Sequence, residues 1–186
     1  MNKGKILEEI SNFLSIPAPY YIECLDISNL YKQDIVAAFL VLTNGESNLA
    51  KSRLYKLENK VEKNLSFLEQ ETKLGSDLDR IKNACRIHYQ KFLPEQLPHL
   101  IIVDGGKEQV KAVQQTLREL ELPTTVIGLA KDEKHRTAKI ITNNLKELEF
   151  GSNERIKNFF TNCQEQVHRY AINFHRKLHR KSVLKS

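Results

Sequence analysis

The chain has 186 residues, a formal net charge of +6 and a sequence pI of about 9.2. This length favours one domain with its own core, and no run approaches the roughly 18 apolar residues that would span a bilayer. The first residues lack the apolar core of a signal peptide. We therefore expect a cytoplasmic protein, and the positive charge favours a polyanionic partner.

The first part of the chain predicts a helix followed by antiparallel strands. Residues 1–18 form an amphipathic helical lead-in, and three strands follow between about residues 20 and 57. Asn44-Gly45 is a strong turn signal between the second strand, 35–42, and the third, 51–57. Residues 61–72 are polar without a clear period, which predicts a loop or a weak helix.

The second part alternates helices and strands. Apolar residues at helical spacing predict helices at 77–92, with Ser76 as N-cap, and at 107–120. Buried strands are expected at 100–104 and 125–129. The remaining elements are an edge hairpin, 137–141 with 146–150, and a long basic helix over about 154–181 that leads into a tail ending at 186.

This order predicts a single α/β domain over residues 1–186. Its sheet would be antiparallel in the first three strands and parallel afterwards, with helices on its faces. It is the element order of an RNase H-like fold.

Two aspartates occupy strand-like apolar runs, which is unusual. Asp26 stands within residues 22–28, and Asp104 ends the run that begins at Leu100. Aspartate is a poor strand former and is seldom buried without a partner. We expect each carboxylate to face a cleft and to bind a cation or handle a proton, although either one alone could instead cap backbone amides. Two such strands side by side would present two carboxylates to one Mg²⁺ or Mn²⁺.

Two further candidates for this site come from helices. His168 borders the apolar stripe of the last helix, where it could complete a metal site, shuttle a proton or be a structural histidine. Asp77 opens its helix, where it could act at the site or only favour the helix dipole. His175 and His179 are four residues apart, but no His-Glu-x-x-His pattern accompanies them, which favours basic surface residues.

Basic residues near these positions suit phosphate groups. Lys107 begins a helix after Gly105-Gly106, where the backbone can approach a ligand closely. Lys131 follows a buried strand and could contact a phosphate or simply be solvated. The last helix has basic residues from His168 onward and no acid, which favours phosphate contacts over a merely solvated face. Its candidates are Arg169, Arg176 and Lys177.

Cys24, Cys85 and Cys163 are far apart and form no Cys-x-x-Cys motif. They predict buried free thiols rather than a zinc site or disulfides. Glu23, next to Cys24 in a strand, is expected to point away from Asp26 and to be structural.

Four segments, in order and spacing, resemble the C-terminal endonuclease domain of UvrC, the incision subunit of bacterial nucleotide excision repair. They are Ile22-Glu23-Cys24-Leu25-Asp26-Ile27-Ser28, Val103-Asp104-Gly105-Gly106-Lys107, Val126-Ile127-Gly128-Leu129-Ala130-Lys131 and His168-Arg169-Tyr170-Ala171-Ile172-Asn173-Phe174-His175-Arg176-Lys177. The resemblance implies an RNase H-like fold and a metal-dependent cut on the 5′ side of a lesion, leaving 3′-hydroxyl and 5′-phosphate ends.

The resemblance also implies roles for single residues and partners. Asp26, Asp104 and His168 would hold Mg²⁺ or Mn²⁺, and Asp77 matches a further catalytic aspartate. Damaged double-stranded DNA would be the substrate. UvrB would be a partner of the full-length protein, although its docking segment, the Gly-Ile-Tyr…Tyr-Ile-Gly nuclease and the helix-hairpin-helix motifs are expected to be absent here.

The chain departs from the family pattern at four positions, Asn29, Lys32, Glu108 and Gln166. Those at Asn29, Lys32 and Glu108 keep open a non-catalytic nucleic-acid-binding module of the same fold. A further alternative is a protein-docking domain within a repair assembly. No aromatic platform or base-reading motif is evident, so we expect no sequence specificity.

Overall fold

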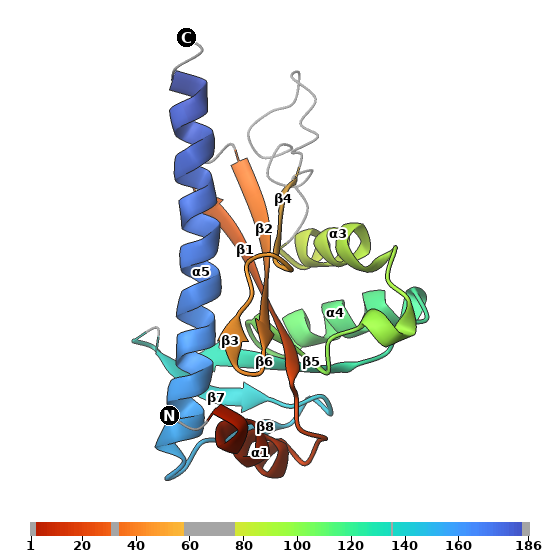
Figure 1. Cartoon of the computed structure of the whole chain (residues 1–186), viewed down its shortest axis with the longest axis vertical. Helices are drawn as coiled ribbons and strands as arrows, with labels where there is room; N and C mark the ends of the chain where they lie inside the picture. The colour runs from red at the N-terminus through yellow and green to blue at the C-terminus, as the bar shows by residue number, and fades with distance from the viewer. Residues whose placement is uncertain (1–2, 31–33, 58–76, 135, 184–186) are drawn as a thin grey trace.

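A mixed sheet forms the centre of the molecule in the computed structural model, which describes residues 3–30, 34–57, 77–134 and 136–183 (Figure 1). Its strands are β1 (Tyr21–Leu30), β2 (Asp34–Thr43), β3 (Glu46–Ser47), β4 (Arg53–Leu57), β5 (Leu100–Asp104), β6 (Thr125–Lys131), β7 (Thr137–Ile141) and β8 (Glu147–Glu149). The helices are α1 (Lys3–Leu14), α3 (Asp77–Tyr89), α4 (Lys107–Glu119) and α5 (Glu154–Val183), with a 3₁₀ turn at Pro94–Gln96.

The strand order is β3-β2-β1-β5-β6-β7-β8, with β4 also paired to β2. β1 runs antiparallel to β2 and parallel to β5, and β5 runs parallel to β6. The predicted change from antiparallel to parallel pairing is therefore confirmed. The edge hairpin of β7 and β8 is confirmed as well, and β7 lies antiparallel to β6.

The Asn44-Gly45 turn differs from the prediction in what it connects. Both residues have positive φ, 52° and 80°, as a tight hairpin turn requires. The turn leads into β3, which pairs with the end of β2, and the chain then bends again before β4. The third strand therefore starts at Arg53 rather than residue 51, because Lys51 and Ser52 donate backbone hydrogen bonds within that bend.

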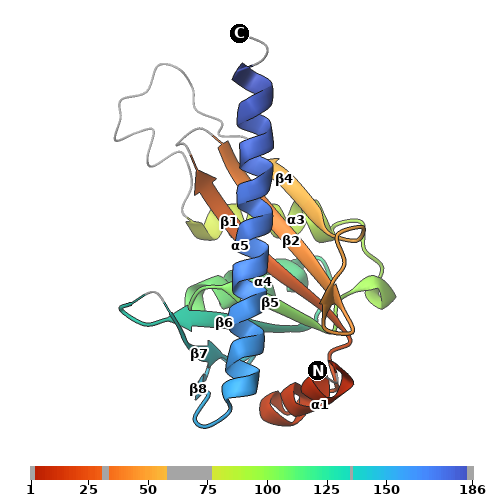
Figure 2. The same ribbon diagram turned by 60° about the vertical axis from the view of Figure 1, so that its left-hand side comes forward.

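Helices cover both faces of the sheet. α5 crosses one face with α1 beside its first turns, and α3 and α4 lie on the other face (Figures 1 and 2). Side chains of β1 alternate between the two layers: Ile22 and Cys24 belong to the core under α5, and Leu25 belongs to the core under α3 and α4. This alternation decides which strand residues can meet α5.

The remaining helix predictions hold with small shifts. α3 ends at Tyr89 rather than at residue 92, and α5 continues to Val183. The predicted N-cap Ser76 and the predicted loop or weak helix at 61–72 lie outside the described residues. Within the described ranges, no helix is both long and apolar enough to cross a membrane.

Candidate metal centre

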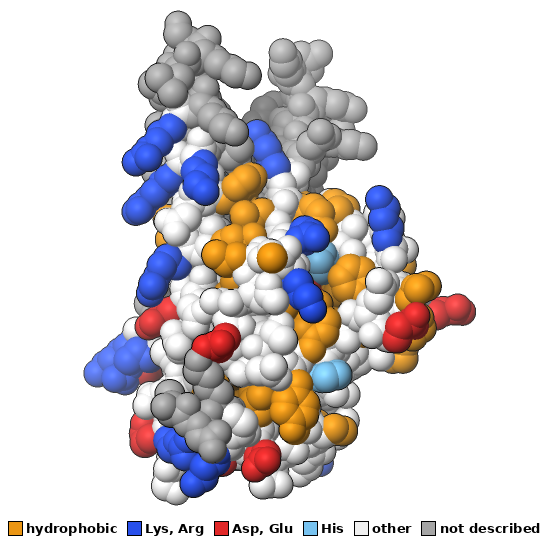
Figure 3. Space-filling view, viewed as in Figure 1, with side chains coloured by type: hydrophobic (Ala, Val, Ile, Leu, Met, Phe, Trp, Pro, Cys, Tyr) orange, Lys and Arg blue, Asp and Glu red, His pale blue; other side chains and the backbone are white. Residues whose placement is uncertain are grey.

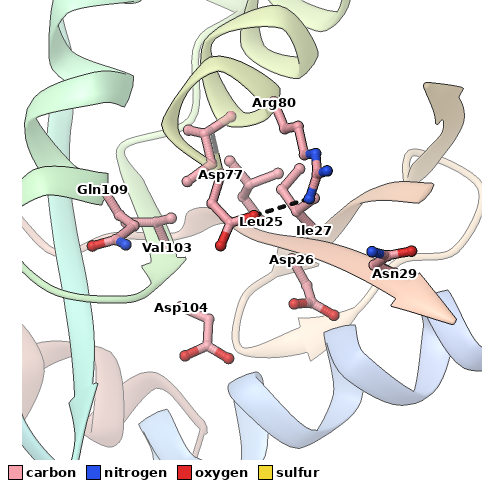
Figure 4. Close-up of a pocket in the computed structure, with 10 residues that line it drawn as sticks. Leu25, Asp26, Ile27, Asn29, Asp77, Arg80, Val103, Asp104 and Gln109 are labelled. Atoms are coloured by element: carbon pink, nitrogen blue, oxygen red, sulfur yellow. Dashed lines mark hydrogen bonds and ion pairs between the residues drawn. The ribbon is translucent and has the colours of Figure 1, made fainter. Parts of the chain in front are cut away.

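Asp26 and Asp104 lie at neighbouring positions on the face of the sheet covered by α5. β1 and β5 are parallel partners, and the pair Leu25 and Val103 immediately precedes the two aspartates. Asp26 is 8% exposed. Burial is the main cause that raises the pKa of Asp26, and the negative charge of Asp104 raises it further, so the two carboxylates interact. Figure 4 shows both carboxylates projecting into the same space.

His168 approaches this pair from α5. Its Nδ1 lies 3.3 Å from Oδ2 of Asp26, and its ring is 59% exposed. Burial raises the pKa of Asp26, and the hydrogen bond and charge of His168 only partly offset this effect. The histidine therefore contacts the buried carboxylate with one nitrogen while much of its ring faces solvent.

Asp104 is held by two side chains that donate to different oxygens. Lys131 Nζ lies 2.8 Å from Oδ2, and Gln164 Nε2 lies 2.7 Å from Oδ1. The hydroxyl of Thr137 donates to Oε1 of Gln164 at 2.5 Å, which orients the amide group toward Asp104. The ammonium group of Lys131 thus occupies a cation position beside Asp104.

Two hollows meet at the aspartate pair. The α3 hollow, about 430 Å³, is lined by Asp77, Arg80, Asn29 and Gln109 among others. The α5 hollow, about 720 Å³, lies between α5 and the β6–β7 connection, and its lining includes Lys131, Arg136, Lys157 and His168. Asp26 and Asp104 line both hollows, so a ligand over them can extend in either direction.

Asp77 reaches the α3 hollow from the first turn of α3. Its side chain is 81% exposed, and Oδ1 accepts a hydrogen bond of 3.0 Å from Nη1 of Arg80 (Figure 4). The fold therefore brings Asp77 to the same hollow as Asp26 and Asp104.

The side chains of Asp26, Asp104 and His168 offer donor atoms that fit a hard divalent cation, although they do not surround one common point. Among the described residues, no group of three or more His, Cys, Asp or Glu side chains is close enough to hold an ion. Lys131, however, stands in for a cation at Asp104, and the adjoining donors are a second carboxylate and an imidazole. Carboxylate oxygens are the ligands that Mg²⁺ and Mn²⁺ prefer.

The other predicted phosphate contacts lie outside the two hollows. Lys107 is exposed at the start of α4. The positive charge of Lys107 acts on Glu147, whose pKa is lowered chiefly by Lys139 and further by Lys107. Arg169, Arg176 and Lys177 are exposed along α5. Figure 3 shows Lys and Arg side chains gathered over that part of α5.

The prediction that His175 is a surface residue is wrong. His175 is 2% exposed, and its Nε2 has no hydrogen-bond partner within the described part of the chain. It lies two helical turns after His168 and one after the buried Ala171, so it faces the sheet. The side chain of His179 lies outside the described residues.

Glu23 is confirmed on the opposite face of β1. It is fully buried and pairs with Nε2 of His88, whose Nδ1 lies 2.9 Å from the hydroxyl of Tyr55. Cys24, Cys85 and Cys163 are buried and free, as predicted.

Sequence reasoning missed Gln164 and Arg80 at the site. Each lies one helical turn from a residue that was identified: Gln164 is four residues before His168, and Arg80 is three after Asp77. Side chains three or four apart share a helix face. This spacing was the signal available in the sequence.

A mixed sheet with two carboxylates at adjacent strand positions and a histidine on the covering helix defines an RNase H-like domain with a candidate metal centre. Residues 11–172 match the family model described as the UvrC RNase H endonuclease domain. The chain belongs to this family, and the predicted RNase H-like fold is confirmed.

Curated relatives agree with this assignment. The UvrABC system protein C of Malacoplasma penetrans is 34% identical over 184 residues, covering 97% of this chain and 29% of the relative. The protein of the same name from Clostridium kluyveri is 34% identical over 187 residues, covering 97% of this chain and 30% of the relative. The chain thus spans less than a third of the length of these relatives.

Solved structures show weaker similarity. Endonuclease V of Ciona intestinalis, in complex with DNA, has a TM-score of 0.39 at 14% identity, covering 70% of this chain and 56% of that one. Human endonuclease V has a TM-score of 0.38 at 12% identity, covering 79% and 80%. The assignment rests on the family match and not on these superpositions.

Proposed function

We propose that this chain is a divalent-metal-dependent DNA endonuclease domain that hydrolyses a phosphodiester bond. The observation that carries the proposal is the convergence of Asp26, Asp104 and His168 where two hollows meet. An open groove with basic side chains, and with two carboxylates that can hold a divalent cation at its floor, suits a phosphate backbone better than a small apolar ligand.

The chain's own residues have distinct tasks in this reaction. Asp26 and Asp104 hold the cation, and Mg²⁺ or Mn²⁺ bound there would polarise the phosphodiester and activate water. Gln164 keeps Asp104 in its orientation. His168 completes the ligand set or moves a proton at the exposed part of its ring, while its Nδ1 stays against Asp26. The oxygen of a water molecule bonds to phosphorus, the bond from phosphorus to the 3′ oxygen breaks, and the 3′ oxygen takes up a proton, giving 3′-hydroxyl and 5′-phosphate ends.

Lys131 has two alternating partners in this scheme. In this structure it pairs with Asp104, and a cation held by Asp104 would leave its ammonium group free to turn toward the α5 hollow, which it also lines. A phosphate group in that hollow is then its natural partner. Lys107, Arg169, Arg176 and Lys177 are proposed to contact the backbone farther from the cut.

We also propose that the longer protein makes the 5′ incision beside a lesion in nucleotide excision repair, with damaged double-stranded DNA as substrate and UvrB as partner. The similarity to UvrABC system protein C supports this role. We place the activity in the cytoplasm, where bacterial DNA lies.

The test is nicking of supercoiled plasmid with Mg²⁺ or Mn²⁺. Wild type should nick, whereas Asp26→Asn and Asp104→Asn should lose at least about 100-fold in rate, as removal of a catalytic electrostatic group typically does. Glu108→Gln is the matched control, because Glu108 is exposed and pairs with Lys111 on its own helix. Resealing of the nicks by DNA ligase checks the proposed end groups.

Equal nicking by all four proteins would mean that the carboxylates are not the site. A folded wild type that binds DNA but never nicks would favour the second candidate, a non-catalytic nucleic-acid-binding module. The specific observation behind that candidate is that both oxygens of Asp104 already have protein partners.

A further inference from the structure

Arg80 is a partly buried cation beside the aspartate pair that the proposed reaction does not use. It lies on α3, one turn after Asp77, and its side chain is only 16% exposed. Figure 4 shows the guanidinium group between Asp77 and the strand that carries Asp26. Among the side chains that line the α3 hollow, Arg80 is the only lysine or arginine in the described part of the chain.

The hydrogen bonds of Arg80 are incomplete. A guanidinium group has five N–H donors. One of its nitrogens, Nη1, donates to Oδ1 of Asp77, whereas Nε is buried and has no partner among the described residues. A buried donor without an acceptor is costly to keep. Within the described residues, the strongly exposed Asp77 is therefore the one hydrogen-bonding side chain seen for Arg80, and it engages a single nitrogen.

The position of Arg80 follows the path that a nucleic acid strand would take. The α3 and α5 hollows share Asp26 and Asp104 and extend from them in different directions. A strand with one phosphate over this pair places neighbouring phosphates in each hollow. The α5 hollow contains acidic side chains as well, among them Asp132, which pairs with Arg136. Its basic residues Lys131, Arg136 and Lys157 can receive a phosphate. In the α3 hollow, three carboxylates would repel a phosphate, and Arg80 offsets them.

We propose that Arg80 binds a backbone phosphate adjacent to the one that lies over Asp26 and Asp104. The ligand class is a phosphodiester of a nucleic acid strand, and the proposal rests on the proposed function because the same groove must accept DNA. Asp77 holds the guanidinium group in place through Nη1, and the terminal nitrogens, rather than the buried Nε, are the donors for the phosphate. A planar guanidinium group suits this contact, since it can bind two phosphate oxygens at once.

The test measures binding without cleavage. Affinity for a short fluorescent DNA duplex is recorded in Ca²⁺ across a salt series for wild type, Arg80→Gln, Arg80→Lys and Asp77→Asn. Arg86→Gln is the matched control, because Arg86 is on the same helix but pairs with Glu119 of α4. Thermal melts establish that each variant is folded at the assay temperature.

We expect Arg80→Gln to weaken binding about tenfold and to reduce the slope of log K against log salt by about 0.9, the value for one phosphate contact. Arg80→Lys should keep the slope, and Asp77→Asn should bind at least as tightly as wild type. Arg86→Gln should match wild type. Under a purely structural ion pair, Asp77→Asn and Arg80→Gln would instead lose stability together and leave the slope unchanged.

The subsite is overturned if folded Arg80→Gln has the wild-type affinity and slope, or if Arg86→Gln loses as much. It is overturned as well if wild type shows no salt-dependent binding. Plasmid nicking separates this failure from that of the nuclease. Nicking by wild type with an unchanged Arg80→Gln slope removes only the subsite. An Arg80-dependent slope in a chain that never nicks removes only the nuclease.

Discussion

At the scale of single residues, Asp26 carries the clearest energetic cost. It is 8% exposed, and burial raises its pKa above the ordinary value near 3.8. The folded protein therefore binds this proton more tightly than the unfolded chain does. As pH rises from the ordinary pKa through the raised one, the folded state loses stability, and the loss is complete once pH is above the raised pKa. The buried, charged carboxylate of Asp26 thus lowers the free energy of unfolding.

Asp26→Asn should accordingly stabilise the metal-free protein at pH 7. We expect a gain of about 0.5–2 kcal/mol, the usual range when a costly feature is relieved. The gain should shrink as pH falls through the raised pKa and should be gone below about 4, because the wild-type carboxyl is then protonated in both states. Urea unfolding in EDTA at several pH values measures this, with Glu108→Gln as the exposed-acid control. A variant less stable than wild type at pH 7 would contradict it.

Lys131 gives a second prediction at this scale. Because its ammonium group lies 2.8 Å from Oδ2 of Asp104, it competes with any cation for that oxygen. Lys131→Met should therefore bind Mn²⁺ about tenfold more tightly without DNA, the equivalent of one charge-assisted hydrogen bond of about 1.5 kcal/mol. Its nicking rate should nevertheless fall, since the phosphate loses a partner.

Isothermal titration with Mn²⁺ measures the Lys131 effect directly. Lys134→Met, an exposed lysine in the connection after β6, is the matched control and should bind Mn²⁺ as wild type does. Weaker Mn²⁺ binding by Lys131→Met would show that the lysine supports the ion rather than competing with it.

At the scale of elements, α3 is attached to the sheet through a buried polar pair. His88 of α3 bonds to Glu23 of β1 and lies against the ring of Phe39 of β2, with 3.9 Å between ring centroids. The pair lies on the opposite face from Asp26. The pair therefore helps to fix α3 against the sheet, and with it the positions of Asp77 and Arg80 beside the aspartate pair.

His88→Leu should destabilise the protein by about 3–5 kcal/mol, because it leaves the buried carboxyl group of Glu23 without this partner. Replacing both partners, as in Glu23→Leu with His88→Leu, should recover part of the loss, since no unpaired charge remains. Denaturant unfolding of the two variants gives both values. A double variant less stable than His88→Leu alone would contradict the argument.

The positions of the strands and helices could be predicted because the local sequence patterns, alternation in strands and helical spacing of apolar residues, agree with the tertiary structure. The alternation around Asp26 and the apolar run before Asp104 determine which face each aspartate occupies, and parallel pairing then brings them together. His175 was mispredicted because basic neighbours, Arg176 and Lys177, suggested an exposed face. Its spacing of four residues from the buried Ala171, which in turn follows the buried Val167 by four, was the better guide.

The partners of the site residues were not predictable in the same way. The Lys131–Asp104 ion pair joins the ends of two strands, and the Gln164–Asp104 bond joins a helix to a strand 60 residues away. Such contacts depend on the length and packing of intervening elements, and no local pattern encodes them. The bend that separates β3 from β4 likewise depends on the hydroxyl of Ser52, which accepts a hydrogen bond from the backbone N–H of Val41 in β2 and donates one to the carbonyl of Asn48.

At the scale of the whole molecule, α5 combines two roles along one axis. Its first half carries Gln164 and His168 over the sheet, and farther along its exposed side carries Arg169, Arg176 and Lys177 (Figure 2). The three basic side chains lie outside both hollows, so they can attract a polyanion without contacting the aspartate pair. Long-range charge of this kind raises affinity and association rate but gives no sequence selectivity.

Replacing Arg169, Arg176 and Lys177 together with Gln should therefore reduce the slope of log K against log salt for duplex DNA by up to about 2.7, or about 0.9 for each phosphate that is no longer neutralised. Mn²⁺ affinity should remain at the wild-type value, because none of the three touches Asp26 or Asp104. A variant with Lys5, Lys91 and Arg118 replaced by Gln removes the same charge from other exposed positions. If both triple variants lose equal slope, DNA responds only to net charge. If the slope falls more in the α5 triple variant than in the control triple variant, this helix is part of the DNA-binding surface.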